Sequence, residues 1–147
     1  LALNRRNFEV QFYNLCDPEH WVEGDPQRLA QVLINLLSNA RDASPPGSAV
    51  RVKSEAYEHT VDLIVEDEGS GIPKNIMDRL FEPFFTTNRS KGGTGLGLSA
   101  AFNAVTLLKG SMSYQADSSL GGAQFNIRIP LNQCDAPKIT THHEFTI

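Results

Sequence analysis

The chain has 147 residues, of which 40% are hydrophobic and 20% charged, and a formal net charge of −4; this is the size and composition of one ordinary globular domain. The acidic balance, with no basic stripe, argues against nucleic acid or an anionic membrane surface as the main partner. The two cysteines, Cys16 and Cys134, lie far apart and in no metal-binding spacing. We therefore expect neither a cysteine metal cage nor a disulfide framework.

The sequence shows no sign of a membrane span or a leader. No apolar run reaches the ~20 residues that a membrane-spanning helix needs, and no signal-peptide pattern is present. The chain begins at Leu1 rather than Met, and we expect it to be a piece of a longer protein whose targeting or membrane part lies elsewhere. Residues 1–132 carry the patterned segments and are expected to form one domain. Residues 133–147 are polar, and we expect a frayed tail.

The first part of the chain is predicted to hold one long helix after short strands. Alternating apolar and polar residues predict a strand over 7–14, and residues 21–24 predict a short second strand. Asp25 then provides a good N-cap, and Pro26 suits the first position of a helix. Up to the breaker sequence SPPGS at 44–48, apolar residues recur at helical spacing, namely Leu29, Val32, Leu33, Leu36, Leu37 and Ala40.

The remaining segments alternate strands with shorter helices. Strands are predicted over 49–58 and 60–69, joined by a tight turn near His59, and a short helix is predicted to begin at Pro73. Residues 86–93 contain no large apolar residue and are predicted to form a loop. A helix over 95–109, ended by Gly110, and a final pair of strands over 111–116 and 123–131 follow. Most strand connections are short. The pattern predicts the α+β class: a two-layer α/β sandwich, in which three helices lie on one face of a mixed, mostly antiparallel sheet.

Two asparagines lie in the interior of the long helix, where asparagine is a poor choice because its amide competes for backbone hydrogen bonds. Asn35 and Asn39 are four residues apart and share one face beside the apolar stripe. They form either an ordinary solvated face or a pair of amides aimed into a cleft. In the second case, an amide oxygen suits a hard cation such as Mg²⁺.

The sequence DEGSGIP at 67–73 directly follows a predicted strand. It is either a plain strand end with a glycine turn or a binding loop. If Asp67 points inward, its carboxylate needs a hydrogen-bond partner, because a buried carboxylate is costly without one. The exocyclic amino group of a purine is such a partner, and Gly69 and Gly71 would let the backbone pass close to a flat base.

The stretch KGGTGLGLSA at 91–100 places glycines directly before a predicted helix. It matches neither the Walker A sequence GxxxxGK[ST] nor the GxGxxG fingerprint, because position 98 is Leu. Glycines here leave several N–H groups free to face one point at a helix N-terminus, where phosphate is the natural ligand. A flexible linker before a helix is the simpler alternative for this segment alone.

In this order and spacing, the segments resemble the ATP-binding catalytic domain of sensor histidine kinases, in the wider GHKL superfamily with DNA gyrase, heat-shock chaperones and mismatch-repair ATPases. INLLSNARDA looks like the N box, DEGSGIP the first glycine box, FEPFFTT the F box and GGTGLGLS the second glycine box. The resemblance covers roughly residues 8–131. It implies the Bergerat fold, which is the left-handed α/β sandwich of that superfamily.

The resemblance also implies roles for individual residues. Asp67 would accept a hydrogen bond from the adenine amino group, and Asn39 would coordinate a Mg²⁺ ion that bridges the phosphates, with Asn35 nearby. Gly69, Gly71 and Ile72 would wall the base. Residues of the second glycine box would offer backbone amides to the phosphates, namely Gly93, Thr94, Gly95, Leu96, Gly97 and Leu98. Residues 86–93 would be a lid over ATP. The three aromatic rings of the F box are Phe81, Phe84 and Phe85. They would anchor that lid or meet a partner domain, and packing in the core is an equal alternative.

Several positions depart from common versions of the pattern. Asp42 stands where many sensor kinases have a lysine that reaches the phosphates, and Asn88 stands where lysine is frequent. Arg89 or Lys91 would substitute if they do not simply extend into solvent. Ala123 replaces a hydroxyl residue that usually helps the adenine-binding aspartate, so we expect that aspartate to lack one partner.

The residue at position 35 bears on the reaction. The ATPases of the superfamily carry a glutamate there to activate water, and an amide cannot take a proton. We therefore expect slow hydrolysis of ATP and phosphoryl transfer to another acceptor, which depends on positioning and charge neutralisation. Asn35 and Lys91 are the candidate catalytic residues, and ATP and Mg²⁺ are the expected cofactors.

The phosphoacceptor is expected to lie outside this chain. The chain has four histidines, His20, His59, His142 and His143. None of them has the H-[ED]-x-x-x-P context of a phosphoacceptor. We expect a histidine-containing dimerisation domain upstream of Leu1, a response regulator as the next partner, and a cytoplasmic, bacterial, full-length homodimer. Nucleic acid and direct membrane contact are not expected.

Two other functions remain open from the sequence. One is a serine kinase of the same fold that acts on a separate protein, although the F box argues against it. The other is a nucleotide-binding regulatory module without transfer activity, which the residues at positions 42, 88 and 123 leave open.

Overall fold

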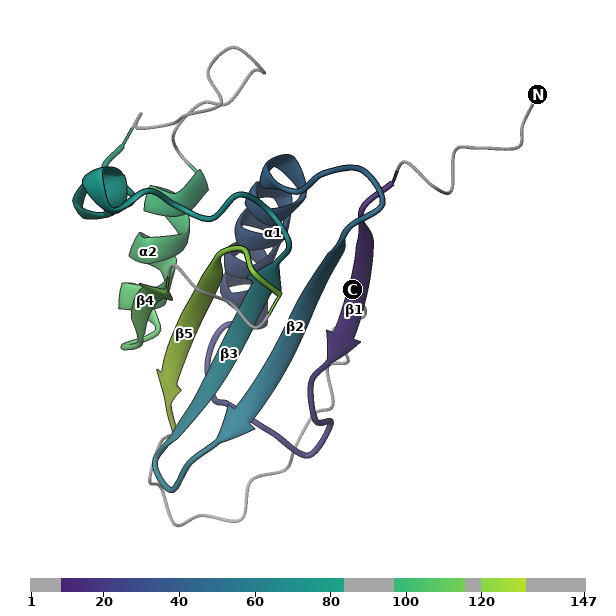
Figure 1. Ribbon diagram of the computed structural model, residues 1–147. Coiled ribbons are helices and arrows are strands. Elements are labelled where there is room, and N and C mark those ends of the chain that lie inside the picture. The colour runs from purple at the N-terminus through teal and green to yellow at the C-terminus, as the bar shows by residue number, and fades with distance from the viewer. Residues whose placement is uncertain (1–8, 84–96, 116–119, 132–147) are drawn as a thin grey trace.

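The computed structural model describes residues 9–83, 97–115 and 120–131, and these form one sheet with helices beside it (Figure 1). In chain order the elements are β1 (Gln11–Leu15), α1 (Pro26–Ala43), β2 (Ala49–Ala56), β3 (Thr60–Asp67), the 3-10 helix η1 (Lys74–Arg79), α2 (Gly97–Leu107), β4 (Ser111–Gln115) and β5 (Gln124–Pro130).

The five strands have the order β1-β2-β3-β5-β4. β1 runs parallel to β2, and every other neighbouring pair is antiparallel. Figure 1 shows α1 and α2 side by side against the sheet. The predicted class, a two-layer sandwich with a mixed and mostly antiparallel sheet, is therefore confirmed, and the helices of the described part are two α-helices and η1.

Helix α1 begins and ends where its sequence indicates. The Asp25 carboxylate accepts a hydrogen bond from the main-chain N–H of Gln27 at 3.0 Å, and Pro26 occupies the first helical position. At the other end, the Ser44 hydroxyl donates to the carbonyl of Ala40 at 2.7 Å. The predicted N-cap and first residue are confirmed.

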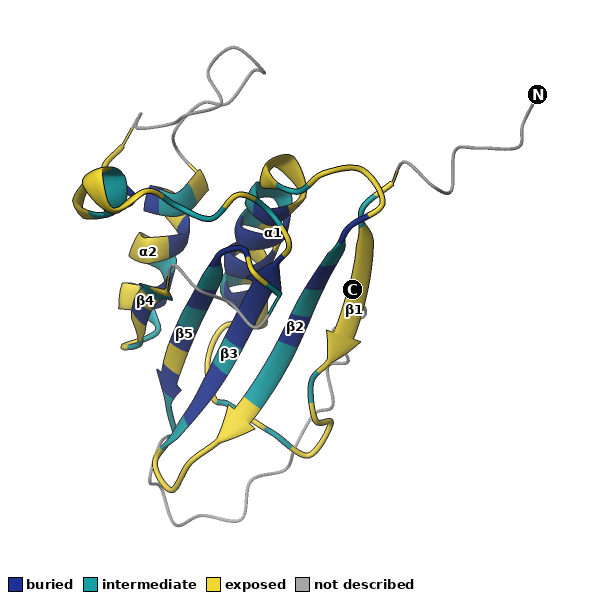
Figure 2. Ribbon diagram, in the orientation of Figure 1, coloured by how far each residue is buried: buried dark blue, intermediate teal, exposed yellow. Residues whose placement is uncertain are grey.

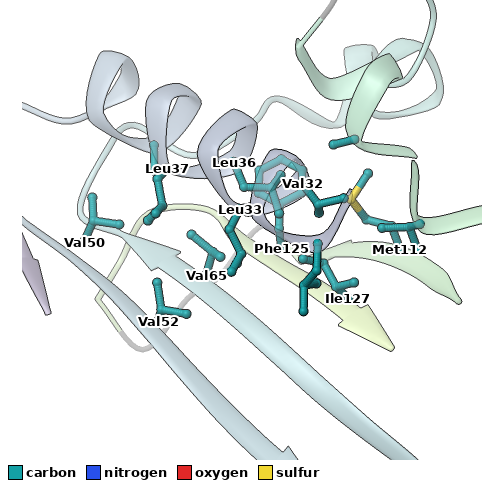
Figure 3. Packing of buried hydrophobic residues seen from close by; sticks show 14 of the residues in the cluster. Val32, Leu33, Leu36, Leu37, Val50, Val52, Val65, Met112, Phe125 and Ile127 are labelled. Carbon is teal, nitrogen blue, oxygen red and sulfur yellow. The ribbon is translucent and has the colours of Figure 1, made fainter. Parts of the chain in front are cut away.

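The core lies between α1, α2 and the sheet. Figure 3 shows the side chains of α1 pointing toward apolar residues of the strands. The buried residues of α1 are the six that the sequence pattern predicts, Leu29, Val32, Leu33, Leu36, Leu37 and Ala40. They pack with buried strand residues that include Val50, Val65, Phe125 and Ile127. Burying a side chain of this size contributes about 1.5–3 kcal/mol, so this interface fixes α1 on the sheet.

The central strand β3 is buried along most of its length, whereas β1 at the edge is exposed (Figure 2). On β3, Asp62 faces away from α1 and its side chain is only 2% exposed. Its carboxylate accepts hydrogen bonds from Nε and Nη2 of Arg128 on β5, each at 2.7 Å, and from Asn126 at 3.2 Å. The Arg128 bonds are the main cause that holds the pKa of Asp62 below its usual value of 3.8.

Asp62→Asn should lower the free energy of unfolding at pH 7 by about 1–2 kcal/mol, because charge-assisted hydrogen bonds to a half-exposed arginine become neutral ones. A carboxylate whose pKa is lowered by folding contributes stability that is present above pH 3.8 and is lost as pH falls through its folded value. Urea denaturation at pH 7 and at more acidic pH should show the two proteins converging in acid. Equal stability of the two proteins at pH 7 would contradict this account.

The strand predicted over 21–24, the bounds of β1 and the end of α2 differ from the structure. The strand predicted over 21–24 is wrong, because these residues form no strand; the edge of β2 is already taken by β1. β1 spans Gln11–Leu15, whereas the prediction was 7–14, of which residues 7 and 8 lie outside the described part. α2 ends at Leu107, and the left-handed residue that stops it is Lys109 (φ 59°), one before the predicted Gly110. The predicted loop over 86–93 and the tail over 133–147 lie outside the described residues.

Candidate nucleotide-binding site

The predicted binding segments that the structure describes gather at one end of the sheet. The C-terminal ends of α1 and β3 and the first turn of α2 lie together at the upper end of Figure 1. Val50, at the start of β2, pairs with Asp67, at the end of β3. Folding therefore brings the N box, the first glycine box and the last residues of the second glycine box to a common place.

Asp67 is the buried carboxylate of this end, with only 3% of its surface exposed. Its Oδ1 accepts hydrogen bonds from the main-chain N–H groups of Gly69 at 2.8 Å and Ala123 at 3.0 Å. The N–H of Asp67 in turn donates to the carbonyl of Ala123 at 3.0 Å. Ala123 is thus a partner of Asp67 through its backbone, although the sequence suggested a loss at this position because the side chain lacks a hydroxyl.

Burial raises the pKa of Asp67 above its usual 3.8, and the hydrogen bonds from Ala123 and Gly69 offset part of this rise. Of the groups described here, Asp67 and Asp62 are two buried carboxylates on one strand whose pKa values move in opposite directions. Asp62 has the Arg128 guanidinium beside it, and Oδ1 of Asp67 accepts the main-chain N–H groups of Gly69 and Ala123. A carboxylate in such a setting is suited to bind a neutral donor group of a ligand.

Adenine-nucleotide affinity should therefore fall as pH falls toward and through the raised pKa of Asp67, because the protonated carboxyl presents a donor to the amino group of the base. The fold itself should survive this step. Since the pKa of Asp67 is higher in the folded state, folding favours its protonation, and its contribution to stability rises as pH falls. Nucleotide titrations between pH 7 and 4, with circular dichroism to follow the fold, measure both effects. An affinity that does not change over this range would contradict the role of Asp67.

The loop after Asp67 is shaped by its glycines. A Cβ at Gly69 would lie 2.6 Å from the carbonyl oxygen of Ala43, so the absent side chain lets the loop pack on the last residue of α1. Gly71 has φ +73°, a backbone conformation that other residues rarely adopt. Ile72 is half-buried and packs against the core. The loop that was predicted to wall a flat base is thus held between α1 and the sheet.

The two helix asparagines differ in their hydrogen bonding. The amide oxygen of Asn35 accepts a bond from Nε2 of Gln31 at 3.0 Å. Among the described residues, no group hydrogen-bonds to the half-buried amide of Asn39. Asn39 lies one helical turn, about 6 Å along the axis, before Ala43 and the loop at Gly69. Its amide oxygen fits the oxygen ligation that Mg²⁺ prefers.

Part of the predicted site lies outside the described residues. This holds for Gly93, Thr94, Gly95 and Leu96, for Lys91, Asn88 and Arg89, and for Phe84 and Phe85 of the F box. At the start of α2, Gly97 is exposed and Leu98 packs against the core. Leu98 therefore anchors the first turn of the helix that follows the glycine stretch.

Residues flanking the site show ordinary packing. Phe81 stacks on Phe102 of α2, with ring centroids 5.1 Å apart. Asp42 is exposed and pairs with Arg41 at 3.1 Å. Near the opposite end of the sheet, Nδ1 of His20 lies 2.8 Å from the hydroxyl of Ser54. Of the four histidines, His142 and His143 lie outside the described part.

In the described parts of the chain, no cluster of three or more His, Cys, Asp or Glu side chains is arranged to hold a metal ion. No helix among them has the length and apolar character that crossing a membrane requires.

Comparison with known proteins identifies the family. The sequence model described as histidine kinase-, DNA gyrase B- and HSP90-like ATPase matches residues 24–133. Among solved structures, the chain is similar to the catalytic domain of histidine kinase ThkA (TM-score 0.71, 33% identity, 82% of this chain and 80% of that one). It is also similar to the mycobacterial sensor histidine kinase MprB (TM-score 0.72, 30% identity, 82% and 81%). The chain therefore belongs to this ATPase family and, within it, to the catalytic domains of histidine kinases.

Curated relatives agree with this placement and are much longer than the chain. Sporulation kinase A of Bacillus subtilis is 39% identical over 110 residues, which cover 75% of this chain and 18% of the relative. The sensor histidine kinase RcsC of Escherichia coli is 37% identical over 136 residues, which cover 88% of this chain and 14% of the relative. The chain thus spans less than a fifth of the length of these two relatives.

Proposed function

We propose that this domain binds Mg-ATP across the end of the sheet and donates the γ-phosphoryl group to a histidine on a separate phosphoacceptor domain. The observation that carries the proposal is the buried Asp67 carboxylate, which neutral main-chain donors hold at the floor of the site. A purine amino group is the donor that such an acceptor suits. Membership of the ATPase family supports nucleotide binding, and ShkA, a similar protein, has been solved with AMPPNP (TM-score 0.72, 26% identity).

In this proposal the ligand extends from the loop at Gly69 along α1 toward the start of α2. Asn39, one turn from that loop, would hold the Mg²⁺ ion, which supplies charge neutralisation for the phosphates. The first turn of α2 would face the phosphates with its main-chain N–H groups. The bond from the γ-phosphorus to the β,γ-bridging oxygen breaks, a bond to an imidazole nitrogen forms, and ADP is the leaving group.

The side chain at position 35 supports transfer rather than hydrolysis. Its amide cannot accept the proton of an attacking water. Its oxygen is also engaged by Gln31 at 3.0 Å, so Gln31 and Asn35 form a neutral pair beside the proposed phosphates. The Gln31–Asn35 pair would therefore offer no general base to a water in the site.

We further infer that the full-length protein is a multidomain sensor kinase, because the curated relatives extend far beyond the matched segment. In that assignment an upstream dimerisation domain carries the acceptor histidine, a response regulator receives the phosphoryl group, and this domain works on the cytoplasmic side.

The test uses the chain, Mg-ATP labelled at the γ-phosphate, and the separately produced phosphoacceptor domain of the full-length protein. We expect label on that domain that is labile in acid and stable in base, and no label when its acceptor histidine is replaced by glutamine. Acid-stable label on serine would overturn the proposal in favour of a serine kinase. Tight ATP binding with no label on any acceptor would identify a regulatory nucleotide-binding module.

A further inference from the structure

A tyrosine on β4 reaches the loop that follows Asp67. The hydroxyl of Tyr114 accepts a hydrogen bond from the main-chain N–H of Ile72 at 2.8 Å. The same hydroxyl lies 3.4 Å from the carbonyl oxygen of Ile72, to which it donates. One side chain thus contacts both polar backbone groups of a residue 42 positions away in the sequence.

The loop that receives these bonds has little regular structure of its own. Residues 68–73 connect the end of β3 to η1 and form neither a helix nor a strand. Gly69 and Gly71 lie within them, and each gives the chain more conformational freedom than another residue would. The backbone of Ile72 therefore needs an external partner to keep one position, and Tyr114 supplies it.

Tyr114 is itself fixed by the sheet. It pairs with Phe125 across β4 and β5, and the two rings lie with centroids 5.3 Å apart. Phe125 is 2% exposed and belongs to the hydrophobic core. The Tyr114 ring is packed against that core, so its hydroxyl is held at the end of a rigid support.

We propose that Tyr114 is a positioning residue of the nucleotide site: through Ile72 it fixes the loop that walls the base above Asp67. This inference rests on the proposed function. Tyr114 has no direct contact with the phosphates in this arrangement, and its effect reaches the ligand only through the base. It therefore governs affinity for adenine nucleotides and leaves the transfer step unchanged.

The test compares Tyr114→Phe with the wild-type chain and with the matched control Tyr13→Phe. The control removes a hydroxyl whose hydrogen-bond partner among the described residues is the nearby Gln11, on the exposed strand β1. We expect Tyr114→Phe to raise the Kd for Mg-ATP by roughly three- to tenfold, the worth of about one hydrogen bond. The KM for ATP should rise by a similar factor at constant kcat. Inhibition by Mg-tripolyphosphate, which has no base, should be the same in all three proteins.

Two further measurements separate positioning from loss of stability. Hydrogen exchange of the Ile72 amide should become faster in Tyr114→Phe, while core amides such as that of Ile127 keep their protection. A purely structural role would lower the melting temperature and weaken Mg-ATP and Mg-tripolyphosphate alike, which would overturn the inference. Unchanged ATP affinity in Tyr114→Phe would also overturn it and leave the proposed function intact, whereas a wild-type chain that binds no ATP would refute the proposed function itself.

Discussion

Asp67→Asn should remove specific adenine-nucleotide binding while the domain stays folded. The amide oxygen of asparagine can still accept the N–H groups of Gly69 and Ala123, which bond to Oδ1 of the aspartate. Its NH₂ group then takes the place of the second carboxylate oxygen and presents a donor to the adenine amino donor. Losing a hydrogen bond to a charged acceptor and burying an unmatched donor costs about 3 kcal/mol, or roughly a 100-fold rise in Kd. Isothermal titration with Mg-ATP measures this change.

Asp62→Asn is the matched control for this substitution. Asp62 is also a buried carboxylate of β3, but it faces the opposite side of the sheet and bonds to Arg128. We expect the two substitutions to have opposite effects. Asp67→Asn should lose affinity for Mg-ATP and keep its free energy of unfolding, because burial already disfavours the charge of Asp67. Asp62→Asn should lower the free energy of unfolding and keep the affinity for Mg-ATP. Unchanged ATP affinity in Asp67→Asn would refute the placement of the base.

Asn39→Ala should abolish the part of nucleotide affinity that depends on Mg²⁺ and should reduce phosphoryl transfer by roughly 100-fold, since even an outer-shell partner of a metal ion is worth about 10–100-fold. The amide of Asn39 is half-buried, and no described group hydrogen-bonds to it, so its oxygen can serve as a ligand of the metal ion. Titrations of ADP with and without Mg²⁺ separate the metal-dependent affinity from the contribution of the base. In the variant the two titrations should give the same Kd.

Asn103→Ala serves as the control for removal of a helical asparagine, because Asn103 is exposed on α2. It should retain both the effect of Mg²⁺ and the rate of transfer. If Asn39→Ala still binds ADP more tightly with Mg²⁺ than without it, the metal ligand lies elsewhere and the assignment of Asn39 is wrong.

Sequence reasoning succeeded where local chemistry decides the structure. The limits of α1 follow from the Asp25 cap and Pro26, and its buried face follows from the helical spacing of its apolar residues. β2, β3 and β5 follow from alternating or apolar strand patterns between turn residues. These features depend on neighbours within a few positions, so one segment contains all the information that is needed.

The contacts that sequence reasoning missed join distant segments. Ala123 supports Asp67 through its main-chain N–H, which no side-chain pattern can indicate. The Tyr114 hydroxyl bonds to Ile72 only because β4 and the loop are brought together by folding. The predicted strand over 21–24 failed for the same reason, since which strand takes an edge depends on a partner elsewhere in the chain. A tyrosine at an inward-facing strand position is the one local signal for a buried polar tip.

The parallel pairing of β1 with β2 places the start of β1 at the same end of the sheet as Asp67. β1 starts beside Ala49, and Val50 in turn pairs with Asp67, so Gln11 lies at the nucleotide end, about 10 Å across the sheet from β3. β5 ends at Pro130 beside Thr60, at the opposite end. In the proposed function, a phosphoacceptor domain tethered ahead of Glu9 would therefore have a high effective concentration at the γ-phosphate, and this concentration would fall as the linker grows beyond the span it must bridge. Lengthening the chain by the same amount after Leu131 would leave that effective concentration unchanged.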